Sequence, residues 1–151
     1  LSSFDRTQVL KLLEMQYSAM LMYTSCGWFF DDLFGIETVQ VIFYAARAMQ
    51  IARDVGGLDL EPGYLNLLEG GQSNVAALGN GKALYEKLVK PDVLTLLRVA
   101  AHYAIASLFE TYPQEKELFY YSFHQENYER HERDKQKIAL GRVRIYSKIT
   151  A

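Results

Sequence analysis

The strongest structural signal in the sequence lies in residues 36–57, which read IETVQVIFYAARAMQIARDVGG. Apolar residues recur there at steps of three and four, the spacing of a helix with one buried face. They are Val41, Tyr44, Ala45, Ala48, Ile51, Ala52 and Val55. The Gly56-Gly57 pair is typical of a helix end, because glycine readily adopts the left-handed conformation that follows the last turn. The pattern therefore predicts an amphipathic helix that contributes one face to a core.

Weaker helical patterns flank this segment on both sides. Helices are predicted at residues 6–23, at 64–69, at 81–89 and from Pro91 to just before Pro113. Asp5 followed by Gln8 is a capping-box-like pair at the start of the first helix. Pro91 suits the first turn of the last helix, because its missing N–H has no helical partner there.

From Leu118 onward apolar and polar residues alternate, which is the period of a strand with one buried face. The alternating sets are Phe119, Tyr121 and Phe123 with Tyr120, Ser122 and His124, and later Val143, Ile145 and Ser147 with Arg142, Arg144 and Tyr146. The charged run at 129–137 is interpreted as the solvated end of a hairpin, with a short helical turn as the alternative. Because a two-stranded hairpin alone is marginal in water, we expect it to pack on the helices or to join a larger sheet.

These patterns predict a mainly α fold, a bundle of about four to five helices followed by a C-terminal β-hairpin. We place the helical bundle at residues 1–115 and the β-hairpin segment at 116–151, as the start or edge of a β region of a parent protein. The sequence does not begin with methionine. Together with the unfinished sheet, this predicts a piece of a longer polypeptide, and processing of the chain is the alternative.

Composition limits the partners that the chain can recruit. The chain has 151 residues, 50% of them hydrophobic, and a net charge of −2, which argues against nucleic acid or an anionic membrane as a partner. A basic strand face made by Arg142, Arg144 and Lys148 allows a nucleic-acid interpretation, but the overall charge disfavours it. No apolar run approaches the about 20 residues that cross a bilayer.

Cysteine and histidine usage narrows the chemistry further. The single cysteine, Cys26, excludes an internal disulfide and a Cys-rich metal site, and a cytoplasmic setting is the default. The three histidines follow no metal-binding spacing, so neither a metal nor a cofactor is predicted.

The segment at 23–32 is the best candidate for a functional surface, because aromatic and acidic residues gather around Gly27 between two predicted helices. The ring of Trp28 suits the C–H face of a sugar, and the carboxylates of Asp31 and Asp32 suit its hydroxyls. Adjacent residues diverge by about 100° on a helix, so this pair is a poor catalytic acid and base. The alternative is a junction core that buries the aromatic rings while one of the acids caps the next helix.

A polar stripe on the next helix can extend the same cleft. Glu37, Gln40, Tyr44 and Arg47 follow one another at steps of three, four and three, so they share one helix face. Glu37 and Arg47 are therefore added to the candidate substrate-binding residues. The alternative is a solvated face in which Arg47 makes a weak ion pair.

Several blocks of this sequence are similar to a known family. The most specific block is MYTSCGWFFDD at residues 22–32, and further blocks lie at 35–40, 44–48, 85–89, 98–105, 107–110 and 139–142. Together they resemble the uncharacterised DUF3536 region of glycoside hydrolase family 57-like proteins, and the resemblance spans nearly the whole chain.

The resemblance implies a parent enzyme that acts on an α-glucan-like polysaccharide, with a catalytic distorted (β/α) barrel N-terminal to this segment. The nucleophile and the general acid would come from that barrel, so no catalytic residue is assigned here. Related members carry a Ser-Asp-Trp-like motif on a helical bundle that closes the cleft. Ser25-Cys26-Gly27-Trp28 is similar to it but places its acids after the tryptophan, so only Trp28 is carried over as a cleft residue.

The resulting hypothesis is a non-catalytic helical domain that supports the barrel and lines a carbohydrate cleft with Trp28, Asp31, Asp32, Glu37 and Arg47. The alternative is a purely structural or protein-interaction module without sugar contact. The identity of the glycan, its linkage, and hydrolysis as opposed to transfer are not predicted.

Overall fold

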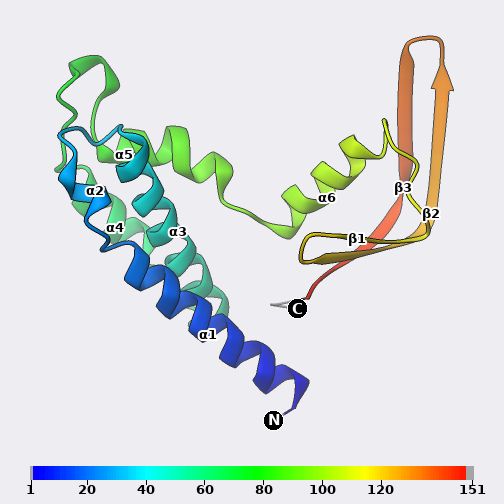
Figure 1. Ribbon diagram of the computed structural model, residues 1–151, viewed down its shortest axis with the longest axis horizontal. Helices are drawn as coiled ribbons and strands as arrows, with labels where there is room; N and C mark the ends of the chain where they lie inside the picture. Colours follow the sequence, from blue (N-terminus) through cyan, green and yellow to red (C-terminus); the bar gives the residue numbers. More distant parts are fainter. Residues whose placement is uncertain (1, 149–151) are drawn as a thin grey trace. The chain divides into compact units, whose positions relative to one another are not determined.

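The chain divides after Val93 into two units, Leu1–Val93 and Leu94–Ala151, in a computed structural model that describes residues 2–148. The first unit holds helices α1 to α5, and the second holds helix α6 and a three-stranded antiparallel sheet (Figure 1). Residues 1 and 149–151, the outer ends of the ranges predicted for the bundle and the hairpin segment, lie outside the described residues.

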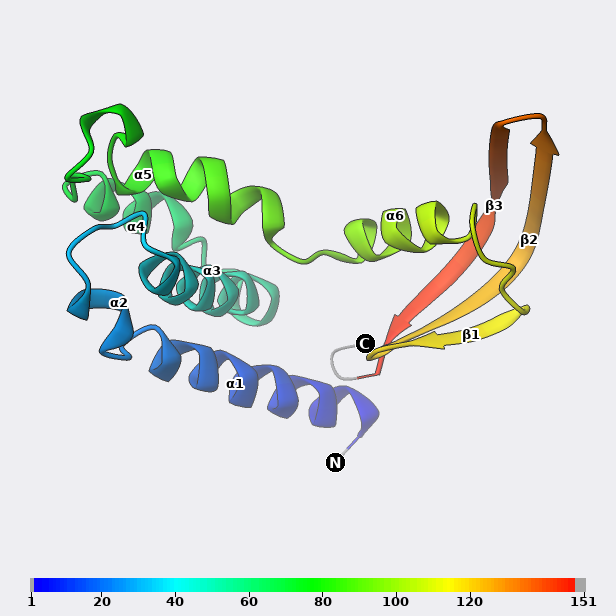
Figure 2. The same ribbon diagram turned by 45° about the horizontal axis from the view of Figure 1, so that its top comes forward.

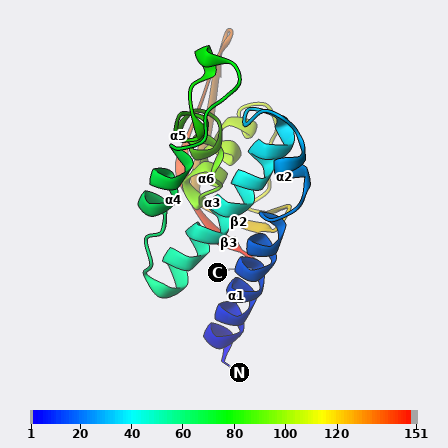
Figure 3. The same ribbon diagram turned by 90° about the vertical axis from the view of Figure 1, so that its left-hand side faces the viewer.

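Helix α3, Ile36–Gly56, is the centre of the first unit and has the bounds that its apolar pattern predicts. It ends at Gly57, which adopts a left-handed φ of 67° and donates its backbone N–H to the carbonyl of Arg53. Its buried residues are Thr38, Ile42, Ala45, Ala46, Ile51 and Ala52. Helix α1, Ser3–Leu21, lies beside it along much of its length (Figure 3).

The capping box of α1 differs from the predicted one. Ser2 is the N-cap, its side chain accepts a hydrogen bond from the N–H of Asp5, and the Asp5 carboxylate accepts one from the N–H of Ser2. Asp5 is therefore the third helical residue of the capping box rather than its N-cap. Ser2 and Asp5 are three residues apart, as Asp5 and Gln8 are, so they satisfy the same capping-box spacing. The helix consequently begins one turn earlier than predicted.

Short helices complete the first unit. They are α2, Cys26–Phe29; α4, Glu61–Leu68; a 3-10 turn, Ala76–Leu78; and α5, Gly81–Leu84, which continues through a π turn, Tyr85–Val89, and a 3-10 turn, Lys90–Asp92. Leu84 and Val89 are fully buried against Ile42 and Ala46 of α3. Burial, with the nearby Glu61 carboxylate, raises the pKa of Tyr85 to about 12.

The second unit begins with α6, Leu96–Ala106, which starts later than predicted. Thr95 is its N-cap and accepts a hydrogen bond from the N–H of Arg98 at 3.3 Å. Pro91 instead lies in the 3-10 turn that ends the preceding helix. The helix begins after Thr95 rather than at Pro91, because the Thr95 hydroxyl accepts a hydrogen bond from a helix N–H and the proline side chain cannot.

The sheet consists of β1, Glu115–Leu118, β2, Tyr121–Arg133, and β3, Gln136–Ser147, in the order β1-β2-β3. Helix α6 covers one face of it (Figure 2), where Tyr103 stacks on Phe123 with ring centroids 4.5 Å apart. Other apolar residues of this core are Val99, Tyr112, Leu118, Tyr121, Tyr128, Val143 and Ile145. Val143 and Ile145 of β3 thus face the core, as their alternation predicts.

The prediction of a mainly α bundle with a two-stranded hairpin is wrong. The sheet has three strands, and the last long helix packs on it within the second unit rather than joining a bundle. Strand β1 reads Glu-Lys-Glu-Leu and lacks the β-branched residues that mark a strand. The turn after it is Phe119-Tyr120, with Phe119 at a φ of 55°, although an aromatic residue rarely adopts a positive φ.

The charged run at 129–137 is mostly strand. Pairing between β2 and β3 continues to Arg133 and Gln136, so only Asp134-Lys135 form the turn. Cross-strand pairs of opposite charge support this, since Lys137 Nζ lies 3.2 Å from Glu132 Oε1. That the 116–151 segment is the edge of a larger β region stays a prediction.

Candidate functional site

Helix α2 is a single turn that packs closely on α3 through Gly27. A Cβ atom at Gly27 would overlap the methyl groups of Val41, so only glycine allows this approach. The buried Thr38 of α3 donates its hydroxyl hydrogen to the Gly27 carbonyl at 3.0 Å. The turn is therefore held against α3 by both packing and a hydrogen bond.

The aromatic residues of this turn point outward. The side chain of Trp28 is 73% exposed, and Phe29 is exposed to the same extent. Phe29 and Phe30 meet edge to face with their ring centroids 5.4 Å apart. These rings do not form a core of the first unit, and Trp28 presents an open indole surface.

Asp32 fixes the chain that follows α2. Its carboxylate accepts hydrogen bonds from the N–H of Phe34 at 2.8 Å, the N–H of Asn74 at 2.7 Å and the hydroxyl of Ser73 at 3.0 Å. The two backbone bonds, from Phe34 and then Asn74, hold the pKa of Asp32 below its ordinary value. The carboxylate thus joins the α2–α3 connection to the loop before α5, and its hydrogen-bonding capacity is largely used inside the unit.

Asp31 contributes to the same junction through its backbone. Its carbonyl oxygen accepts a hydrogen bond from the side-chain amide of Asn74, while the residue itself is exposed. Asn74 therefore bonds both adjacent acids, one through its backbone and one through its side chain.

A shallow groove of about 330 Å³ lies between α2 and the first turns of α3. It is lined by Thr24, Cys26, Ile36, Glu37, Gln40, Val41 and Tyr44. The predicted stripe of Glu37, Gln40 and Tyr44 therefore faces this groove. Its carboxylate, amide and phenol can exchange hydrogen bonds with a polar ligand.

Arg47, the fourth residue of the stripe, serves a different purpose. Its Nε donates a hydrogen bond to Glu14 Oε1 of α1 at 2.8 Å, and its Nη1 donates one to Gln50 at 2.6 Å. Both charged side chains are about one third exposed, at 34% and 31%. Arg47 therefore links α1 to α3, which is close to the ion-pair alternative for this residue.

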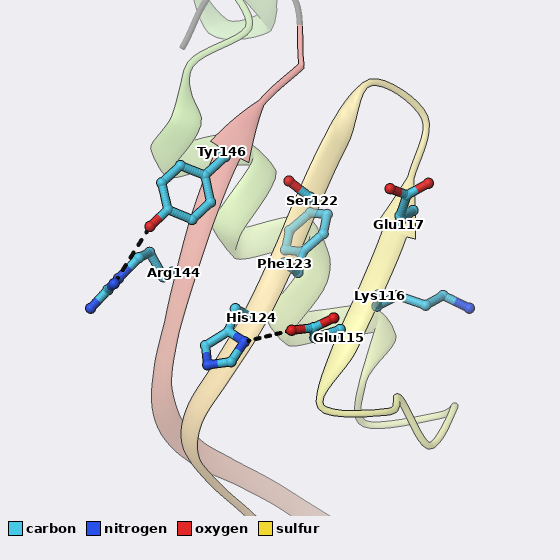
Figure 4. A pocket seen from close by; sticks show the side chains of 8 residues that line it. All are labelled: Glu115, Lys116, Glu117, Ser122, Phe123, His124, Arg144 and Tyr146. Carbon is cyan, nitrogen blue, oxygen red and sulfur yellow. Dashed lines mark hydrogen bonds and ion pairs between the residues drawn. The ribbon is translucent and has the colours of Figure 1, made fainter.

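A second polar surface lies on the open face of the sheet, opposite α6 (Figure 4). Glu115, His124 and Arg144 stand opposite one another in the strand register and form one row, and Glu117, Ser122 and Tyr146 form the next. They line a hollow of about 620 Å³. His124 Nδ1 lies 3.4 Å from Glu115 Oε1, and Arg144 bonds the carboxylate of Glu126.

The comparison with protein families decides where the chain belongs. Its sequence matches the model of a family described as "Domain of unknown function (DUF3536)" over residues 1–151. The chain belongs to the DUF3536 family. No curated protein and no solved structure matches it. The family description assigns no activity, so the relation to glycoside hydrolase family 57 stays a proposal.

The five predicted site residues of this DUF3536 chain do not line one cavity. Glu37 lines the α2–α3 groove, whereas Trp28 and Asp31 are exposed and do not line it. Asp32 and Arg47 instead make bonds that hold the unit together. Among residues 2–148, no group of three or more His, Cys, Asp or Glu side chains is placed to hold a metal ion, and no helix has the length and apolar character to cross a membrane.

Three residues that support the DUF3536 junction were not predicted. They are Ser73, Asn74 and Thr38. Ser73 and Asn74 lie more than 40 residues after Asp32, and no spacing rule connects them. Gly70-Gly71 and Gly79 flank Ser73 and Asn74 in the sequence, which is typical of a loop, but this pattern does not indicate which residue the loop contacts.

Proposed function

We propose that this DUF3536 chain is a non-catalytic module of a carbohydrate-active protein related to glycoside hydrolase family 57, and that its α2 turn contacts an α-glucan-like polysaccharide. The observation that supports this most directly is the open indole ring of Trp28 on a turn anchored from both sides. An exposed aromatic ring on a fixed backbone can stack on a sugar with little loss of conformational entropy.

The roles of the neighbouring residues follow from their contacts. Glu37 and Gln40, from the groove, would exchange hydrogen bonds with sugar hydroxyls, and the exposed Asp31 would extend that polar rim. Asp32 and Arg47 would act indirectly, by holding the turn and the α1–α3 pair in place. This revises the direct contacts expected for both residues.

The proposal includes the setting of the chain. A catalytic barrel of the same polypeptide would supply the acid residues and the opposite wall of the cleft, as the family resemblance implies. The role in carbohydrate metabolism is therefore supportive, and no catalytic step is assigned to this chain. A cytoplasmic location is part of the proposal, on the argument that the sequence carries one cysteine.

Calorimetric titration with maltoheptaose tests the sugar contact. We expect weak binding, with a dissociation constant on the order of 1 mM, because one wall alone covers little of the ligand. Trp28→Ala should weaken binding about tenfold, the loss of one stacking contact. Phe109→Ala is the matched control, since Phe109 is an equally exposed aromatic residue of the second unit, at 72%. Equal affinities for the wild-type and Trp28→Ala chains would contradict the proposal.

A second candidate is a protein-interaction module, and α1 favours it. The exposed residues Val9, Leu13, Tyr17 and Met20 recur at steps of four, four and three and form an apolar stripe on one helix face. Such a stripe commonly marks an interface. This candidate predicts that maltoheptaose releases no heat, whereas Leu13→Glu lowers the concentration-dependent light scattering of the chain.

A further inference from the structure

The outer edge of strand β3 is long and unpaired by any described strand. β3 is the last strand in the sheet order and extends over 12 residues, and its only strand partner among residues 2–148 is β2. An edge of this length presents a row of backbone N–H and C=O groups that can pair with another strand. Natural sheets usually shorten, cover or interrupt such edges.

The direction of the backbone groups follows from one hydrogen bond. The N–H of Lys148 donates to the carbonyl of Tyr120 at 2.7 Å, so it points toward the β2 side. Successive N–H groups of a strand alternate between its two edges. The register irregularity lies between Gln125 and Asn127 of β2, so β3 keeps its alternation. The N–H groups of Ala139, Gly141, Val143 and Ile145 therefore point to the free edge.

The part of the β2–β3 hairpin that extends beyond β1 has fewer strand partners than the part beside β1. β1 pairs only with residues 121–124 of β2, so from Glu126 onward the ribbon has two strands and projects beyond β1 (Figure 1). Ile138 and Leu140 of β3 are both more than half exposed on this ribbon. A third strand there would cover apolar surface and stabilise a ribbon that is marginal in water.

Charge indicates the kind of strand that fits. β3 contains Lys137, Arg142 and Arg144 and no acidic residue. Arg144 bonds the carboxylate of Glu126, and Arg142 Nε lies 3.9 Å from that same carboxylate. One carboxylate thus faces two guanidinium groups, whose side chains are 59% and 81% exposed. The edge carries surplus positive charge beside an apolar pair.

A second copy of β3 is a poor occupant, because the antiparallel register that places Val143 opposite Val143 would set Arg142 and Arg144 of one chain against Arg144 and Arg142 of the other. Like charges opposite each other destabilise a pair of strands. A strand with acidic residues opposite Arg142 and Arg144, and apolar residues opposite Leu140 and Ile138, matches both features of the edge.

We propose that the free edge of β3 binds an extended acidic strand of a separate polypeptide by β-strand addition. Backbone hydrogen bonds to Ala139, Gly141, Val143 and Ile145 supply the affinity, and the alternate side chains supply the selectivity. This inference does not depend on the sugar contact of α2.

The probe is a synthetic peptide whose alternate residues are Glu, Glu, Leu and Leu, separated by threonine, and which pairs antiparallel with β3. Binding to the 151-residue chain is followed by fluorescence anisotropy of a labelled peptide. We expect saturable binding that weakens at least about tenfold in the Arg142→Glu/Arg144→Glu variant, where two attractions become repulsions. A Lys82→Glu/Lys87→Glu variant changes the net charge equally in the helical unit and should bind as the wild type does.

Two further experiments distinguish strand addition from nonspecific binding of an acidic peptide to the basic side chains of β3. Ala139→Pro removes an outward N–H while leaving the β2 ladder in place, so it should abolish binding and preserve the circular dichroism spectrum. A peptide N-methylated on the residues that face β3 keeps its charge but should not bind. Equal binding of this peptide, or of one with lysine in place of glutamate, would overturn the proposal. Self-association of the chain that Ala139→Pro abolishes would overturn it in favour of a second copy.

Discussion

In the helical unit, two of the four polar candidate side chains bond within the unit, whereas in the second unit polar side chains line the open face of a sheet. Asp32 and Arg47 join distant segments, and the aromatic rings of α2 lie on the surface. On the sheet, alternation alone separates the buried Phe123 from its neighbour His124, whose side chain is 42% exposed. The difference teaches that a polar residue between helices can have a structural partner far along the chain. In a strand, by contrast, the position of a residue in the alternation indicates directly whether its side chain is exposed.

The aromatic core of the second unit should give the largest effect. Tyr103 is 1% exposed and contacts the rings of Phe123, Tyr112 and Tyr128. Tyr103→Ala should lower the free energy of unfolding of this unit by about 3–5 kcal/mol, through lost burial and a cavity. Tyr120→Ala, at an exposed turn position, should cost less than about 0.5 kcal/mol. Urea denaturation, monitored by hydrogen exchange of the β2 amides, measures the change in the free energy of unfolding for both variants. Similar changes for the two variants would mean that this aromatic cluster is not the core.

The close approach of α2 to α3 should give the next largest effect. Gly27→Ala should destabilise the helical unit by about 1–3 kcal/mol, because the new methyl group overlaps Val41. Val41→Ala opens that space, so the double variant should recover most of the loss that Gly27→Ala causes. A double-mutant cycle by urea denaturation tests the contact. Strictly additive costs would show that the two residues do not meet.

The carboxylate of Asp32 should make the α2 junction sensitive to acid. Its pKa lies below the ordinary value of 3.8, so its contribution is present above that value and is lost as the pH falls through the folded-state pKa. Asp32→Ala should lower Tm by a few degrees at pH 7, and this difference should vanish in strong acid. Asp31→Ala is the control, since its carbonyl rather than its carboxylate bonds Asn74. A pH-independent gap between the Asp32→Ala and wild-type Tm values would contradict this role.

The Arg47–Glu14 pair should give the smallest effect. Partly exposed ion pairs contribute about 0.2–1 kcal/mol, and this one is about one third exposed on both sides. Arg47→Ala and Glu14→Ala should each cost that little, and the double variant should cost no more than the larger single change. A coupling energy near zero in high salt as well as in low salt would show that the pair is not an electrostatic link.

Periodicity predicted the parts of the fold that depend on local sequence. The apolar steps and Gly57 located α3, and the alternation from Tyr121 onward located the core face of β2. It missed β1, because Glu115–Leu118 has the composition of a helix or a loop and is a strand only through its pairing with β2. The third strand of the sheet was therefore not predictable from local sequence, because it forms only through tertiary pairing with β2.

The sequence located the junction at α2 but not the contacts that its residues make. Gly27 between aromatic and acidic residues marked a junction whose aromatic rings lie on the surface of the unit. The use of Asp32 was not predictable, because its partners Ser73 and Asn74 follow more than 40 residues later in a loop. The polar face of the sheet was missed as a surface because each of its two rows includes a residue of β1.

The single tryptophan of the chain allows the most direct test of the sugar contact. Because Trp28 is the sole tryptophan, intrinsic emission and its quenching by acrylamide report on this one ring. We predict the emission of an exposed indole in the free chain, and a blue shift with protection from acrylamide as maltoheptaose is added. An emission spectrum and a quenching constant that stay unchanged up to saturating sugar would contradict the contact of Trp28 with carbohydrate.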